Sequence, residues 1–131
     1  MSAFSNIFEI ALLDHIFHYD VYTFPRTAMV VALWIGSPTD TGSGGAEVSG
    51  GDYVRVLTTP SDWSAALLGS IDNSNMISFN EATASWGEIT HFGLFNTTED
   101  MLFYGLLTAP VTITTGQVAI FPPYQLAVTL W

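Results

Sequence analysis

The sequence contains no cysteine and no lysine, and each absence removes a class of function. Without cysteine the chain has no disulfide framework, no thiolate zinc site and no cysteine nucleophile. Without lysine it has no Walker-type phosphate loop, and 2 arginines are too few for the clustered cations that nucleic acid or an anionic membrane attracts. The longest apolar run, 28–35, is too short to cross a bilayer, and no basic stretch precedes a hydrophobic one at the start. We therefore expect no nucleic-acid partner, no membrane partner and no secretory signal.

Charge is scarce and almost entirely of one sign. Asp and Glu number 12 against 2 Arg, so the formal net charge is −10, and charged residues make up 11% of the chain. A soluble domain usually has about 25% charged residues. Hydrophobic residues make up 49%, which excludes an intrinsically disordered chain. So few charges leave wide uncharged areas on a folded surface, and because such areas usually belong to interfaces, we expect a homo-oligomer.

The N-terminal region predicts one helix over 6–18. Asn6 is a good N-cap residue, and Glu9, three positions later, completes a capping-box pattern. The apolar residues that follow occupy more than one face of this helix. We therefore expect another subunit to cover part of it.

After Pro25 the pattern changes to short strands separated by turn-forming residues. The continuous apolar run 28–35 is typical of a central strand buried on both faces, and the alternation over 124–131 is typical of a half-exposed strand. The predicted strands are 28–35, 53–59, 76–79, 89–95, 101–107, 118–121 and 124–131.

These elements predict a mostly β fold, a β-sandwich or jelly-roll-like barrel with one N-terminal helix, in a single domain over 1–131. The glycine- and serine-rich stretch 36–51 is too close to the start to separate two domains, so it is expected to be a flexible loop within one.

Three kinds of side chain could carry chemistry, and each has a simpler explanation. His15 and His18 lie one turn apart on the predicted helix and could form a zinc site with His91, although histidines among apolar neighbours are more often packed in a core or an interface. Tryptophans could stack on sugars, but in β domains they more often anchor cores or interfaces. Carboxylates at turns could form an acid–base pair, but they usually provide solubility; they are Asp20, Glu81, Glu88, Glu99 and Asp100. We expect no catalytic residue, no metal and no cofactor, and therefore no enzyme.

The candidate interface residues are large apolar side chains near the chain ends and the tryptophans. Chain ends can reach a neighbouring molecule without disturbing a core. Arg26 and Arg55 are the only two cationic side chains that could pair with acidic groups on a partner. The predicted interface residues are Phe4, Phe8, Ile10, Trp34, Trp63, Trp86, Tyr124 and Trp131.

Three stretches resemble a family of small bacteriophage virion structural proteins. They are 5–15, at the predicted helix, then 32–55, which includes the glycine-rich segment, and 79–95. The last stretch is the most specific, with Trp86-Gly87 followed by His91-Phe92-Gly93. The C-terminal strands, from 117 to 131, are also similar to the family.

The resemblance implies a virion component without catalysis, of a kind described as tail-fibre-like or as a capsid decoration protein. We favour a capsid cement protein that binds across subunits of the major capsid protein on the outer capsid surface, after a stage in the host cytoplasm during assembly. Decoration proteins commonly sit where three capsid subunits meet, so by this analogy we expect the oligomer to be a homotrimer. The alternative is a tail or tail-fibre protein. A glycan-binding or hydrolytic module is a third possibility, which would need an aromatic platform or two opposed carboxylates.

Overall fold

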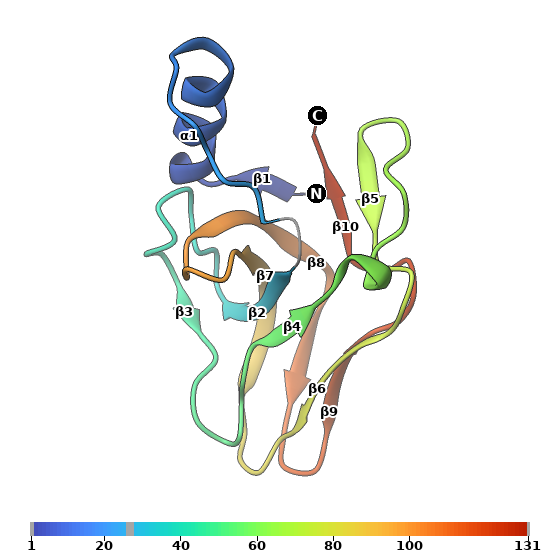
Figure 1. Ribbon diagram of the computed structural model, residues 1–131. Coiled ribbons are helices and arrows are strands. Elements are labelled where there is room, and N and C mark those ends of the chain that lie inside the picture. The colour runs from blue at the N-terminus through green and yellow to red at the C-terminus, as the bar shows by residue number, and fades with distance from the viewer. Residues whose placement is uncertain (1, 26–27, 131) are drawn as a thin grey trace.

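The structure is a computed structural model that describes residues 2–25 and 28–130 (Figure 1). It is mostly β, with antiparallel sheets and one N-terminal α-helix, which confirms the predicted fold class. None of the helices among the described residues has the length and hydropathy that a membrane span requires. In chain order the elements are β1 (Ser2–Phe4), α1 (Asn6–Phe17), β2 (Met29–Ile35), β3 (Ala46–Glu47), β4 (Val56–Thr58), the 3₁₀ helix η1 (Pro60–Asp62), β5 (Ser70–Asp72), β6 (Ile77–Glu81), β7 (Gly87–Phe95), β8 (Met101–Ile113), β9 (Val118–Phe121) and β10 (Ala127–Thr129).

One six-stranded sheet organises the fold. Its strands run in the order β1-β8-β7-β2-β3, and β4 also pairs with β2. Two smaller sheets, β6–β9 and β5–β10, each contain two strands. The sequence prediction of a central strand near 28–35 is confirmed, because β2 lies inside the large sheet and its residues from Val31 to Trp34 are buried.

Side chains of β2 enter two separate cores because successive residues of a strand point to opposite faces. Val31 and Leu33 join the main hydrophobic core, together with buried residues of β6, β7 and β10. Ala32 and Trp34 belong to a second cluster with Phe95 and Met101. The main core contains side chains of the large sheet and of the two small sheets that cover it, which gives a sandwich-like arrangement (Figure 1).

The glycine-rich segment 36–51 lies against the second cluster. The indole Nε1 of Trp34 donates a hydrogen bond of 2.9 Å to the carbonyl oxygen of Gly44. A Cβ atom on Gly42 would already be in contact with Met101, at 3.5 Å, and the backbone there has a φ of +73° that favours glycine. A Cβ atom on Gly45 would lie 2.6 Å from the Ile35 carbonyl oxygen, so at Gly45 the lack of a side chain lets the segment approach β2 closely. Its flexibility stays a prediction.

The helix begins one residue earlier than the capping pattern indicates. Ser5, not Asn6, is the N-cap residue, and its hydroxyl oxygen accepts a hydrogen bond of 3.3 Å from the Phe8 backbone N–H. The same hydroxyl donates to the Met101 carbonyl oxygen, and the Ser5 backbone N–H donates to the Leu102 carbonyl oxygen at 2.9 Å. The correction has a tertiary cause, because β1 pairs with β8 and thereby places Ser5 at the buried junction.

Strand β8 continues well past the predicted end at 107. It passes through Pro110, which has no N–H to donate to a ladder. The register against β7 shifts between Ile89 and His91, so that several residues of β8 around the proline are left out of the ladder. A bulge thus accommodates Pro110 within the strand.

The alternation predicted over 124–131 holds only in its middle. Leu126 and Val128 are buried, whereas Tyr124 and Leu130 are exposed. The strand itself is short, β10, and it pairs with β5, a strand that the sequence did not predict.

Asn73 is the most connected polar side chain of the interior. It is 0% exposed, and its side-chain oxygen accepts a hydrogen bond of 2.9 Å from the Leu126 backbone N–H. Its amide nitrogen donates to the carbonyl oxygens of Asn75 and Pro122 at 2.9 Å, and to that of Phe121 at 3.3 Å. One amide therefore joins the end of β5 to the chain between β9 and β10.

Replacing Asn73 with alanine removes these side-chain hydrogen bonds and leaves the backbone N–H of the buried Leu126 without this acceptor. We expect Asn73→Ala to lower the free energy of unfolding by about 2–4 kcal/mol in denaturant titrations. The matched control is Asn80→Ala, because Asn80 is exposed and makes one amide hydrogen bond, of 3.0 Å, to Asp52. The control is expected to change the stability by less than about 0.5 kcal/mol, and equal effects at the two sites would contradict the prediction.

Candidate interaction surfaces

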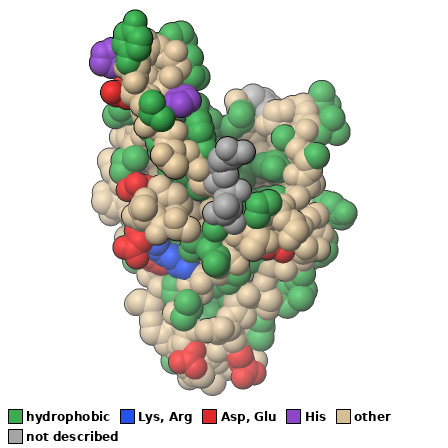
Figure 2. Space-filling view, viewed as in Figure 1, with side chains coloured by type: hydrophobic (Ala, Val, Ile, Leu, Met, Phe, Trp, Pro, Cys, Tyr) green, Lys and Arg blue, Asp and Glu red, His purple; other side chains and the backbone are tan. Residues whose placement is uncertain are grey.

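Helix α1 projects from the body of the protein with its apolar side chains largely uncovered (Figure 1). Phe8 is its one residue classed as buried among those described. Ile10, Leu13 and Phe17 are 61%, 56% and 79% exposed. Spaced three and four residues apart, they share one side of the helix, opposite Phe8. Figure 2 shows hydrophobic and histidine side chains gathered over this projecting part.

Both ends of α1 are held to the rest of the chain. At the start, the aromatic rings of Phe4, Phe8 and Phe103 pack edge to face, with centroids 5.1–5.4 Å apart. Near the end, the Nδ1 atom of His15 accepts a hydrogen bond of 3.1 Å from the Tyr22 backbone N–H, and the His15 ring packs on Phe24. The exposed stripe is thus presented by a helix with a fixed orientation.

A second surface is the groove where the two layers separate between β8 and β9. The strands are joined by the turn at 114–117, yet β9 pairs with β6, and no described strand pairs with the outer edge of β8 beyond Gly105. The groove has a volume of about 640 Å³, and none of the described residues that line it is charged. Leu106 is 58% exposed and Val111 45%. The sequence analysis missed this groove, although an uncharged run from Met101 to Ile113 was its signal.

A third surface is a smaller groove, of about 460 Å³, beside β5 and β10. Its described lining is uncharged and mostly apolar, and it includes Trp63 and Leu130 beside Thr59, Ser64 and Ser70. The Trp63 indole Nε1 donates a hydrogen bond of 2.9 Å to the Thr58 hydroxyl oxygen, which fixes one wall of the groove.

Arg55 is engaged inside the chain. Its Nε and Nη2 atoms donate hydrogen bonds of 2.8 Å to the two carboxylate oxygens of Glu47, and its guanidinium lies 3.9 Å from the centre of the Phe95 ring. The hydrogen bonds to Glu47 raise the pKa of Arg55. Tyr53 also donates to Glu47, at 2.8 Å. Arg55 is therefore a structural cation, while Arg26, the other candidate for pairing with a partner, lies outside the described residues.

We expect this ion pair to be energetically coupled. In a double-mutant cycle of Glu47→Gln and Arg55→Gln, the coupling free energy of unfolding should be about 1–3 kcal/mol, because the pair is bidentate and mostly buried. The exposed pair of His18 and Asp20, 3.8 Å apart, serves as the control with a coupling near zero. Equal coupling in the two cycles would contradict the structural role of Arg55.

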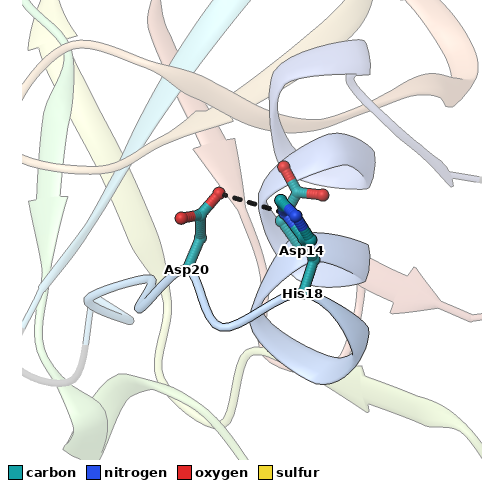
Figure 3. Close-up of side chains that lie close together, drawn as sticks. All are labelled: Asp14, His18 and Asp20. Atoms are coloured by element: carbon teal, nitrogen blue, oxygen red, sulfur yellow. Dashed lines mark ion pairs between the residues drawn. The ribbon is translucent and has the colours of Figure 1, made fainter.

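The three histidines do not come together. His15 contacts Phe24, and His91 lies on β7, where its Nδ1 atom is 2.7 Å from the Thr90 hydroxyl and burial lowers its pKa. His18 instead lies near Asp14 and Asp20 at the exposed end of α1 (Figure 3). Such an exposed group is commonly solvated, and its ion pair contributes little to stability.

The predicted interface residues separate into a buried, a half-buried and an exposed group, apart from Trp131. Phe8, Trp34 and Trp86 are buried inside the chain, Phe4 and Trp63 are half-buried, and Trp131 lies outside the described residues. Ile10 and Tyr124 are exposed, so these two offer the most surface to a partner. The exposed residues around Ile10 on α1 belong to the helix that the sequence analysis expected another subunit to cover.

Apolar surfaces without a charged cleft are typical of a subunit that works in an assembly. The comparison with known families agrees with this class. The chain belongs to the family described as Podophage GP4 fiber I protein gp80, whose model matches residues 3–129. No curated protein matches the chain. This match confirms the resemblance found in the sequence, to a family of small, tail-fibre-like structural proteins of phage virions.

Proposed function

We propose that this protein is a fibre subunit of a podophage virion and that it works as a homotrimer without catalytic activity. The observation that carries the proposal is the match to a fibre protein family over residues 3–129, nearly the whole chain. The fibre assignment takes the place of capsid cement as our first choice, because the family description names a fibre.

The grooves and tryptophans of the described residues form no recognisable active site, which supports a structural role. Both grooves are lined by uncharged side chains among the described residues, so neither offers a pair of carboxylates to a substrate. The described tryptophans are buried or half-buried, with their indole N–H groups bonded to the chain, so they offer no open platform for sugar rings.

Self-association fits the groove between β8 and β9. Copies with a formal net charge of −10 repel one another, so a contact between them is favoured where carboxylates are absent. The described lining of this groove meets that condition, and its apolar side chains gain free energy when they leave water. Three copies related by rotation would form a closed assembly.

Capsid cement remains the second candidate, with the major capsid protein as partner on the outer capsid surface. One observation favours it: α1, the one α-helix among the described residues, has 12 residues, and the other described elements are strands and a 3₁₀ helix, with no coiled coil among them. Fibre subunits more often add repeats or a coiled coil.

Position and copy number in the virion separate the two candidates. We expect gold-labelled antibody against the protein to mark the tail region, and quantitative mass spectrometry of purified virions to give a few dozen copies or fewer. Hundreds of copies spread over the shell would instead establish the cement role.

The groove makes a separate prediction about the oligomer. Leu106→Asp places a carboxylate in the groove, and we expect it to weaken self-association by about tenfold or more, as measured by analytical ultracentrifugation. Leu68→Asp is the matched control, because Leu68 is exposed but lies outside the groove. A variant at 106 that associates like the control would show that the copies meet elsewhere.

A further inference from the structure

We infer that the exposed stripe of α1 attaches this subunit to a different virion protein, in an apolar groove edged by lysine or arginine side chains. The inference rests on the proposed function, since it names the attachment surface of the fibre subunit. The stripe consists of Ile10, Leu13 and Phe17, which point away from the Phe8 side that packs on the body.

Acidic side chains flank the stripe on both sides. By the rotation of an α-helix, Glu9 and Asp14 lie at the two edges of the apolar stripe. A third acidic residue, Asp40, is close to the start of the helix, because its backbone carbonyl oxygen accepts a hydrogen bond of 2.9 Å from the Asn6 backbone N–H, while its carboxylate accepts one from the Tyr104 hydroxyl. The hydrogen bond to Asp40, burial, and the charges of Asp40 and Glu9 together raise the pKa of Tyr104 to about 12. The helix therefore presents an apolar ridge in a negative field.

This charge pattern argues against a second copy as the occupant. Glu9 and Asp14 are five residues apart, the spacing at which flanking residues of two parallel helices meet across an apolar seam. Two copies packed in this way would bring carboxylates together, and an antiparallel pair would also place like charges opposite each other. Arg55, the one described arginine, is occupied by Glu47. The described residues of a second copy therefore offer no unoccupied lysine or arginine to these carboxylates, which favours cations supplied by another protein.

A partner with an apolar groove edged by basic side chains would match both the apolar stripe and the carboxylates that flank it. An apolar helix face that enters a groove of another protein is a common mode of recognition, with anchors at spacings of three and four residues. Because α1 is held at both ends, it loses little conformational freedom on docking. The negative charge of the whole chain would also accelerate its approach to a basic surface.

The experiment restores the purified chain to particles assembled without it. These particles come from a phage in which the gene for the chain carries a stop codon, and binding is measured by co-sedimentation over a range of salt concentrations. We expect wild-type binding to weaken as salt rises. The double variant Ile10→Ser with Phe17→Ser should bind about tenfold more weakly or worse, whereas Leu67→Ser with Leu68→Ser, an equally exposed apolar pair, should bind like wild type.

A charge reversal separates a foreign partner from a second copy. Glu9→Lys should weaken particle binding by about tenfold and leave self-association unchanged, while Glu88→Lys, the same change at an exposed site on β7, should affect neither. If α1 were the contact between copies, Glu9→Lys would pair with Asp14 of a neighbour and strengthen self-association. That result would overturn the inference. Circular dichroism checks that each variant keeps its helix.

The outcomes for the helix and for the fibre role are distinct. If the wild-type chain binds the tail region and the α1 variants bind equally well, the helix inference is wrong and the fibre role stands. If binding depends on α1 but maps to the shell, the fibre role is wrong and the helix inference stands. A wild-type chain that binds no particle contradicts both.

Discussion

The ion pair between Glu47 and Arg55 is the interaction on which the other features depend, because Arg55 is the one described arginine in a chain with 12 acidic residues. The ion pair fastens β3 to the segment before β4 and lays the guanidinium on Phe95. With that cation occupied, the remaining described carboxylates have no lysine or arginine among the described residues to neutralise them. They are therefore stable where water or neutral donors solvate them, and the interior has to be joined by other means.

Hydrogen bonds between neutral groups connect the chain segments that ion pairs connect in other proteins. Asn73 connects three chain segments with one amide, and Ser5 joins the helix to β8 with one hydroxyl. The indole groups act similarly, since Trp34 donates to Gly44 and Trp86 to Gly51, each at 2.9 Å. In both cases a ring in the core holds a glycine of a long loop. Tryptophan thus serves here as a loop anchor, in keeping with its large buried area and single polar atom.

Elements whose signal is local were predictable from the sequence. The helix over 6–18 follows from a capping pattern ahead of an apolar segment, and the buried strand at 28–35 follows from a continuous apolar run; both are present as α1 and β2. Elements that depend on distant partners were missed: β1 exists because β8 pairs with it, and β3 because β2 passes beside the glycine-rich segment. The same holds for the surfaces. The apolar character of α1 was visible in the sequence, but the groove between β8 and β9 arises only where two strands joined by a turn fail to pair.

The surfaces left exposed differ in a way that follows from the shortage of cations. A carboxylate at the edge of an interface loses part of its hydration, and it regains that free energy only if a cation faces it. A copy of the same chain has almost none to offer, so a contact between copies is least costly on a face without acids, such as the groove between β8 and β9. An apolar ridge between Glu9 and Asp14 is suited to a molecule of the opposite charge. The shortage of cations therefore distinguishes the groove between β8 and β9, which suits a contact between copies of the chain, from the apolar ridge of α1, which suits a different protein.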